Sequence, residues 1–145
     1  MTFHHVGYLV RDTARSADAL RHFFPEITLQ RKAHELQGAH ITYLVSADGN
    51  MTLELVEPFD TNTLLAGKLD RQKQECLPYH ICLHVDDFDV EYDRLRRHGW
   101  LALTRPFESF TFGTQAAHLY KPAAGIVEIM GRSAGLPVDR PGIEE

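Results

Sequence analysis

Cysteine and clustered positive charge are both scarce in this sequence of 145 residues. The two cysteines, Cys76 and Cys82, cannot form the multi-disulfide framework of a small secreted domain, and Cys82 lies in an apolar run where a buried thiol is expected. The net charge is −5, and no run of Lys or Arg is long enough to neutralise nucleic-acid phosphates or anionic lipids. We therefore expect no nucleic-acid partner.

Long hydrophobic runs are also missing. No window approaches the roughly 18 consecutive apolar residues of a membrane-spanning helix, and the first residues lack the basic region and apolar core of a signal peptide. The expectation is a cytoplasmic protein with no membrane partner. The chain is 43% hydrophobic and 24% charged, which is typical of a folded protein, and its length predicts one structural domain overall.

An internal repeat organises the chain. Residues in the first half recur in the second at a constant spacing of 75 residues, in the pairs His5/His80, Val10/Val85 and Asp12/Asp87. Later in each half, the four residues from Leu53 match the four from Val127 at a spacing of 74. One shared residue would mean nothing, but a nearly constant register across half the chain indicates a duplication.

Each half has the same predicted order of elements, βαβββ. The helices are expected to begin at Asp12 and Asp87, which are good N-caps, and the second is expected to stop at Gly99. Alternating or apolar runs predict the strands, at 5–10, 27–32, 40–45 and 52–56 in the first half and at 80–85, 100–104, 116–120 and 126–130 in the second.

These elements predict an α+β protein with four segments. The segments are a first βαβββ module (1–58), a helical connector (59–78), a second βαβββ module (79–131) and a loose C-terminal tail (132–145). The tail has no hydrophobic periodicity and contains two prolines.

Two carboxylates interrupt apolar strands at repeat-equivalent positions, Glu54 and Glu128. Burying an ionised carboxylate costs several kcal/mol unless a cation or strong donors compensate it. His5 and His80 are also equivalent to each other, so an approximate two-fold would bring two imidazoles and two carboxylates together. Taken singly, each residue reads as a core histidine or a solvent-facing glutamate. Taken as two pairs, they favour a divalent metal site, with Zn, Ni, Co, Fe or Mn preferred over Ca or Mg.

Other polar residues fit that site less well. His4 must face the opposite side of its strand from His5, and Glu57 the opposite side from Glu54, where it is expected to end the strand in water. His84 shares the face of His80, but a structural role is favoured. His40 and His118 lie in predicted strands, and the sequence gives no reason to choose between them as cavity residues.

The motifs resemble those of the vicinal oxygen chelate superfamily, which includes glyoxalase I, methylmalonyl-CoA epimerase and extradiol dioxygenases. The resemblance covers roughly residues 3–131. Its four ligand positions match His5 in His-Val-Gly-Tyr-Leu-Val, Glu54 in Glu-Leu-Val-Glu-Pro, His80 in His-Ile-Cys-Leu-His-Val and Glu128 in Gly-Ile-Val-Glu-Ile. The resemblance implies two βαβββ modules forming a curved, cup-like mixed sheet around a central metal site, and a homodimer.

The helical connector and the turn at Tyr120-Lys121-Pro122 resemble the methylmalonyl-CoA epimerase type most closely. Epimerases of this kind can carry a second proton-transfer base after a Gln-Gly pair. Here Gln37-Gly38 is followed by Ala-His-Ile, and the equivalent position is Ile41. Two-base epimerisation is therefore in doubt, with His40 as a substitute only if the register shifts.

The resemblance implies an isomerase that forms a metal-bound enolate of an acyl thioester, with Glu128 as the general base and Glu54 as ligand and opposing base. One alternative is a glyoxalase I-type lactoylglutathione lyase acting on a glutathione adduct. Another is a non-haem Fe(II) dioxygenase, which a coordinated Glu54 would crowd. The last is a metal-free small-molecule or drug-binding module, which retention of all four ligands disfavours.

Overall fold

The computed structural model describes residues 1–109 and 113–132. The chain divides into two compact units. We call His5–Tyr79 the N-terminal half, and residues 80–132 together with Met1–His4 the C-terminal half. None of the helices in the described ranges combines the length and the apolar character needed to cross a bilayer. The predicted tail lies, apart from Arg132, outside the described residues.

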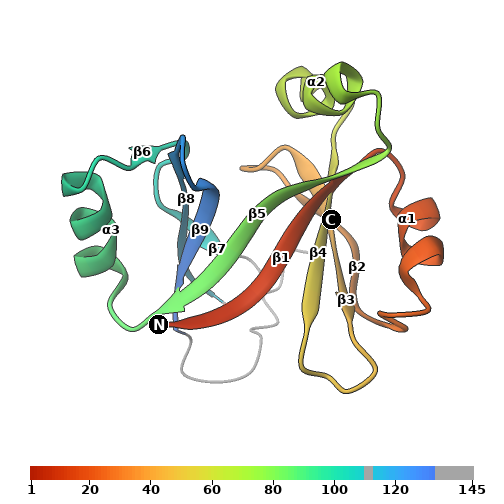
Figure 1. Ribbon diagram of the computed structural model, residues 1–145, viewed down its shortest axis with the longest axis horizontal. Helices are drawn as coiled ribbons and strands as arrows, with labels where there is room; N and C mark the ends of the chain where they lie inside the picture. Colours follow the sequence, from red (N-terminus) through yellow and green to blue (C-terminus); the bar gives the residue numbers. More distant parts are fainter. Residues whose placement is uncertain (110–112, 133–145) are drawn as a thin grey trace. The chain divides into compact units, whose positions relative to one another are not determined.

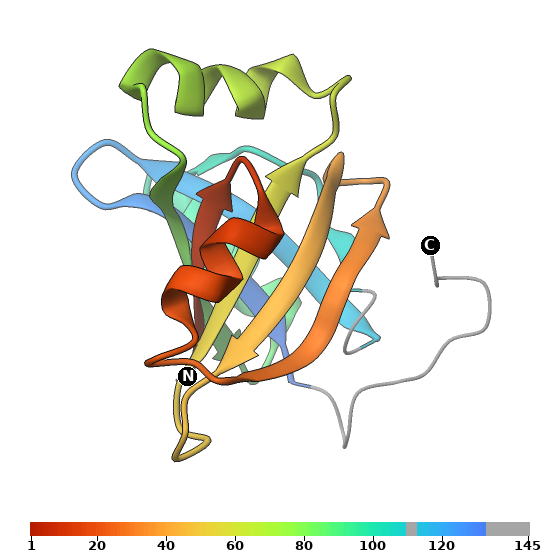
Figure 2. The ribbon, with the colours of Figure 1, turned by 90° about the vertical axis from the view of Figure 1, so that its right-hand side faces the viewer.

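The N-terminal half follows the predicted order (Figure 1). Its strands are hydrogen-bonded in the order β2-β3-β4-β1, with β1 and β4 parallel and the other pairs antiparallel; Figure 2 shows β2, β3 and β4 side by side. The elements are β1 (Thr2–Val10), α1 (Thr13–Leu20), β2 (Glu26–His34), β3 (Ala39–Val45), β4 (Thr52–Pro58) and α2 (Thr63–Gln72).

The C-terminal half repeats this plan with one addition. Strand β5 pairs in parallel with β9, β9 pairs antiparallel with β8, and two short strands, β6 and β7, both pair with β8. The elements are β5 (Cys76–Val85), α3 (Phe88–Arg97), β6 (Leu101–Ala102), β7 (Phe107–Ser109), β8 (Thr114–Lys121) and β9 (Gly125–Gly131). The α+β class and the doubled βαβββ order are thus confirmed.

Strand β7 was not expected from the sequence, and β6 is shorter than the predicted strand over 100–104. Pro106 separates the two pieces, and it has no N–H to donate to a ladder. The chain instead bends, with Leu103 N and Thr104 N both directed at the carbonyl oxygen of His118. One strand position beside β8 is therefore filled by two short strands.

Side-chain capping starts α1 and α3 at the two aspartates where the sequence predicts it. The Asp12 carboxylate accepts a hydrogen bond from Arg15 N at 3.1 Å, and the Asp87 carboxylate accepts one from Val90 N at 3.2 Å. Helix α3 ends just before Gly99, whose φ of +86° suits a residue without a Cβ. Helix α1 ends at Leu20, several residues before Pro25.

Helix α2 is capped by Asn62, whose side chain bonds in two directions. Its Oδ1 accepts from Leu65 N at 3.2 Å, and its Nδ2 donates to the carbonyl oxygens of Gln37 and Gly38 in the β2–β3 turn. Gly38 has a φ of +65°, and a Cβ there would lie 2.8 Å from Asn62 Nδ2. The turn and the start of α2 are therefore in direct contact, through hydrogen bonds from Asn62 and close packing against Gly38.

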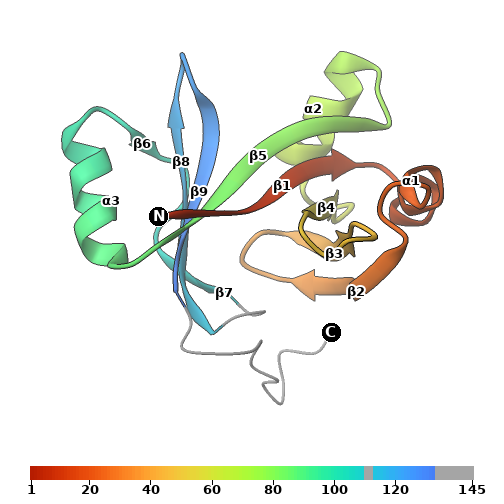
Figure 3. The ribbon, with the colours of Figure 1, turned by 60° about the horizontal axis from the view of Figure 1, so that its bottom comes forward.

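Apolar side chains cover one face of the sheet in each half. In the N-terminal half they pack with α1, and in the C-terminal half with α3, which lies along β8 and β9 in Figure 3. The buried members are Val10, Leu44, Leu53 and Leu55 in the first cluster and Val85, Phe88, Ala117, Leu119 and Ile129 in the second. Because strand side chains alternate, the polar residues between them point to the opposite face.

Candidate metal centre

His5 on β1 and Glu54 on β4 lie on the face of the N-terminal sheet opposite α1. The parallel register aligns Gly7 with Glu54, so His5, two residues before Gly7, projects from the same face. The His5 side chain is fully buried, the Glu54 side chain is 4% exposed, and His5 Nε2 lies 3.6 Å from Glu54 Oε2. The strands therefore hold an imidazole and a carboxylate together away from water.

Tyr43 is the third polar residue of this face. It lies directly across from Glu54 in the antiparallel β3–β4 pair, it is buried, and its ring centroid is 5.7 Å from that of His5. A neutral phenol can donate or accept a hydrogen bond but does not ordinarily bind a divalent ion. The N-terminal half thus presents two conventional metal ligands and one phenol.

Among its described residues, the C-terminal half brings three buried donors together. Glu128 on β9 lies between β5 and β8, where its register partners are Cys82 and His118. His118 Nε2 is 2.9 Å from Glu128 Oε2, and the His118 ring meets that of His80 edge to face at 5.1 Å. One ligand atom from each of His80, His118 and Glu128 lies within 4.8 Å of the others, and all three residues are buried.

The chemistry of these donors fits a divalent metal ion. Each half buries one glutamate within 4 Å of an imidazole, and burying an ionised carboxylate is costly unless positive charge or strong donors compensate it. Imidazole nitrogen and carboxylate oxygen together suit Zn, Fe, Co, Ni or Mn. Buried groups of this kind could hold an ion, and they include His5 and Glu54 in the N-terminal half and His80, His118 and Glu128 in the C-terminal half.

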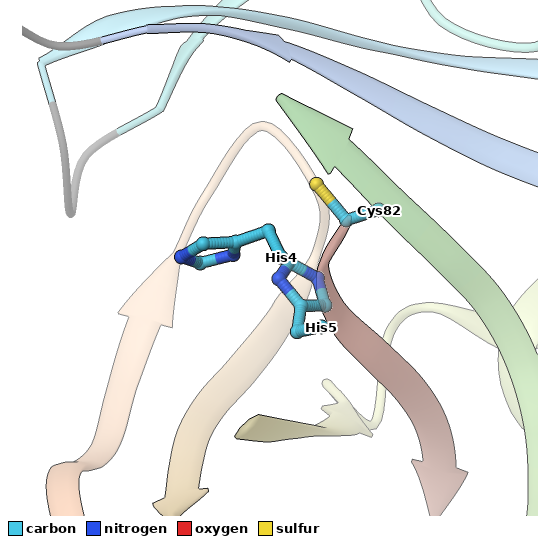
Figure 4. A group of neighbouring side chains, drawn as sticks. All are labelled: His4, His5 and Cys82. Atoms are coloured by element: carbon cyan, nitrogen blue, oxygen red, sulfur yellow. The ribbon is translucent and has the colours of Figure 1, made fainter. Parts of the chain in front are cut away.

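His4 and His84 form a separate pair. Figure 4 shows His4 and His5 leaving β1 in different directions, with Cys82 on β5. The His4 ring lies 4.5 Å from that of His84. Burial and the nearby charge of Arg132 lower the pKa of His84 below its ordinary value, against the opposing effect of Glu128. The neutral form of His84 is therefore favoured, and its ring packs against that of His4 at an interplanar angle of 35°.

Glu57 faces away from Glu54, as expected, but it does not end its strand in water. Its side chain is 15% exposed, it accepts from both the backbone N and the hydroxyl of Thr13, and Arg31 Nη2 donates to it at 2.9 Å. Burial by itself raises the pKa of the Glu57 carboxyl, but the hydrogen bonds from Arg31 and Thr13 outweigh it and hold the pKa below its ordinary value. Glu57 joins α1 to β4.

The register of β3 separates Ile41 from His40. Ile41 pairs with Val56, on the face that carries Glu54, whereas His40 pairs with Glu57 on the opposite face. The His40 ring packs instead against Phe59, with the centroids 4.8 Å apart. Ile41, which the family resemblance equates with the second base, is fully buried.

The sequence did not single out Tyr43 or distinguish His118 from His40. A usable signal was present, because Tyr43 and His118 are related by the same spacing of 75 residues that relates His5 to His80. If all polar strand residues 75 positions apart are compared, and not only identical ones, Tyr43 and His118 are recognised as equivalent positions.

Comparison with known proteins agrees with this architecture. The model of the Glyoxalase/Bleomycin resistance protein/Dioxygenase superfamily matches residues 4–117. No curated protein is similar enough in sequence to match.

Solved structures of the same fold include two methylmalonyl-CoA epimerases. The enzyme from Mycobacterium tuberculosis is 19% identical, with 91% of this chain and 88% of that one covered and a TM-score of 0.73. A variant of the Streptomyces coelicolor enzyme, in complex with 2-nitronate-propionyl-CoA, is 22% identical, with 93% and 99% covered and a TM-score of 0.74. A hypothetical protein from Bacillus halodurans C-125 is 18% identical, with 96% and 98% covered and a TM-score of 0.72. With its doubled βαβββ order and this family match, the chain belongs to the glyoxalase/bleomycin resistance/dioxygenase superfamily.

Proposed function

We propose that this protein is a metal-dependent isomerase of acyl thioesters, similar to methylmalonyl-CoA epimerase, with His5, Glu54, His80 and Glu128 as the ligands of one divalent ion. The observation that carries the proposal is the buried histidine–glutamate pair in each half, His5 with Glu54 and His80 near Glu128. The fold it shares with methylmalonyl-CoA epimerases supports the substrate class, since one of those structures holds methylmalonyl-CoA itself.

A divalent ion bound there would polarise a thioester carbonyl and stabilise the negative charge that develops when the adjacent carbon loses its proton. The chain's own residues would then move that proton. Glu128 is the general base, because its carboxylate is buried beside two imidazoles, with Oε2 2.9 Å from His118 Nε2. Glu54 is the group available to return a proton from the other half.

A glyoxalase I-type isomerisation is the second candidate, and Ile41 is the observation that favours it. Inverting a stereocentre calls for proton transfer on two faces of the carbon, whereas moving a proton between adjacent carbons can use one base. Ile41 cannot accept a proton, and it occupies the position of the suspected second base. The glutathione adduct of an α-ketoaldehyde is then the substrate to test beside the acyl-CoA.

The test measures exchange of the α-proton. Metal-loaded protein is incubated with methylmalonyl-CoA in heavy water, and deuterium at the α-carbon and the ratio of epimers are followed by NMR and mass spectrometry. A parallel assay follows formation of lactoylglutathione. We expect exchange with methylmalonyl-CoA that disappears on chelation; neither exchange nor epimerisation would overturn the epimerase assignment, and lactoylglutathione formation alone would establish the second candidate.

Two matched variants localise the activity. Glu54→Gln and Glu57→Gln change the same atoms on one strand, but only Glu54 faces the proposed ion. Glu54→Gln should lower the exchange rate by about 100-fold or more, the size of a typical general acid–base contribution. Glu57→Gln should leave the rate within about threefold of wild type at neutral pH, once both proteins are shown to be folded.

A further inference from the structure

We propose that His118 is a metal ligand, so that the C-terminal half carries a complete three-donor set of its own: His80, His118 and Glu128. The inference rests on the proposed metal-dependent function but adds a ligand to the four-residue set. The proposal predicts an asymmetric metal centre. The C-terminal half supplies three ligands, His80, His118 and Glu128, and the N-terminal half supplies His5 and Glu54.

The three donor atoms are spaced closely enough to bind one ion. Ligands bonded to one ion at about 2.0–2.2 Å lie roughly 3.0–3.5 Å from each other when adjacent. His118 Nε2 is 2.9 Å from Glu128 Oε2, and one donor atom from each of His80, His118 and Glu128 falls within 4.8 Å of the other two. A small movement of the side chains therefore places all three around one ion.

The types of donor also match a three-ligand metal site. Two imidazole nitrogens and one carboxylate oxygen form the set that binds Zn, Fe and Co in many three-ligand sites and leaves further positions open. All three side chains come from adjacent strands, β5, β9 and β8, rather than from loops. A site built on paired strands is held in place before any ion arrives.

His118 is also held in place from its other sides. Its ring stacks on that of Phe107, with the centroids 5.6 Å apart and the planes at 25°. Its backbone N donates to Thr104 Oγ1 at 2.9 Å, and its carbonyl oxygen accepts from Leu103 N at 2.9 Å. The bend between β6 and β7 thus fixes the strand position from which His118 projects toward Glu128.

The N-terminal half lacks a comparable third donor among its described residues. Tyr43 takes the position equivalent to His118, opposite the strand glutamate, and a neutral phenol is a poor ligand. Loss of the N-terminal ligands should therefore weaken metal binding without abolishing it. Loss of the C-terminal ligands should remove it.

Counting coordinated imidazoles tests the proposal on the unmodified protein. In the Co(II)-loaded protein, each histidine bound to the ion gives one exchangeable ring N–H resonance shifted far outside the normal proton range. Ring 15N labelling identifies these signals as histidine. We expect three such signals, of which His118→Phe removes one. Two signals in the wild type, unchanged by His118→Phe, would overturn the proposal while leaving the isomerase intact.

A second measurement uses the predicted asymmetry. The double variant His5→Ala/Glu54→Ala should still bind about one Co(II) per chain, measured by titration and elemental analysis. Adding His118→Phe should weaken this binding by more than about 100-fold, since a residue that only orients a ligand costs about 10–100-fold. Adding His84→Phe, which removes a half-buried imidazole of the same half, should change the affinity by less than about threefold.

The remaining outcomes are also decisive. Retention of binding in the triple variant with His118→Phe, or a Co(II)–thiolate charge-transfer band from Cys82 in the double variant, would overturn the role of His118. A wild-type protein that takes up no divalent ion would overturn both this inference and the proposed function. Three imidazole signals without thioester exchange would keep His118 as a ligand and reject the isomerase.

Discussion

Tyr43 and His118 occupy the same position in the two halves of the chain, each directly across an antiparallel strand pair from the buried glutamate of its half. The duplication has thus kept the backbone register and the glutamate, and it has changed the chemistry of the residue opposite. A phenol stands beside Glu54 and an imidazole beside Glu128. The two carboxylates therefore lie in chemically different surroundings.

Removing the Tyr43 hydroxyl should have little effect on metal binding. Tyr43→Phe keeps the ring beside His5 and removes only the oxygen, which is not a ligand in the proposed centre. We expect the dissociation constant for Co(II), measured by titration, to stay within about threefold of wild type. A loss of about 100-fold would mean that the phenol oxygen binds the ion.

Removing the metal should destabilise the protein. Metal that binds only the folded state adds about 2.7 kcal/mol to the unfolding free energy when its free concentration is 100 times the dissociation constant. Chemical denaturation with and without a chelator measures this difference. It should be lost in a Glu128→Ala variant and kept in Glu57→Gln; equal stabilisation of both variants would place the ion elsewhere.

Ile41→Glu should supply a base on the face of Glu54 at a cost in stability. Ile41 is fully buried, so an unpaired carboxyl there should lower the unfolding free energy by about 3 kcal/mol or more. If the position is the missing second base, the ratio of epimerisation to deuterium exchange should rise in Ile41→Glu. Ile41→Gln, which matches the glutamate in shape, should show the same loss of stability without that rise, and a rise in both variants would exclude a role as base.

Glu57 should make stability depend on pH. Because the pKa of this carboxyl is lowered in the folded protein, its contribution is fully present above the ordinary glutamate pKa of about 4.3 and is lost as the pH falls through the lower folded value. Glu57→Gln should therefore lower the unfolding free energy by about 1–2 kcal/mol at pH 7. The difference should shrink below about pH 4; a difference that stays constant down to about pH 2.5 would contradict the assigned hydrogen bonds.

The helix caps should contribute equally in the two halves. Asp12→Ala and Asp87→Ala each remove a carboxylate that accepts a hydrogen bond from the first turn of a helix. Each should lower the unfolding free energy by about 1 kcal/mol. Asp12→Asn and Asp87→Asn, which keep an acceptor oxygen, should recover most of that loss, and equal losses for Ala and Asn would point to charge rather than capping.

The repeat made most of the fold predictable. Hydrophobic alternation placed eight of the strand positions and the two aspartate caps placed the starts of α1 and α3, because these signals are local. Strand β7 was missed because three residues are too few to show a period, and the predicted strand at 100–104 was overextended across residues that turn toward His118.

The candidate site was less accessible to sequence reasoning. Alternation correctly put Glu57 opposite Glu54, but nothing in the local sequence shows that Arg31 and Thr13 would enclose it. His118 was not separated from His40 by local pattern alone, since strand pairing determines which face a residue occupies; the repeat spacing to Tyr43 was the one sequence signal that favoured it.

The side-chain amide of Asn62 attaches the start of α2 to the β2–β3 turn. Because one side chain both caps α2 and bonds the turn around Gly38, moving the helix away from that end of the sheet would break the two hydrogen bonds that Asn62 Nδ2 donates, while the cap would stay with the helix. Asn62→Asp would keep the acceptor and discard the donors, leaving the helix capped but no longer fastened to the turn. The Asn62 amide thus adds a polar attachment at the start of the connector to the hydrogen bond from Phe59 N to Gly38 O and the burial of Leu65 and Leu69.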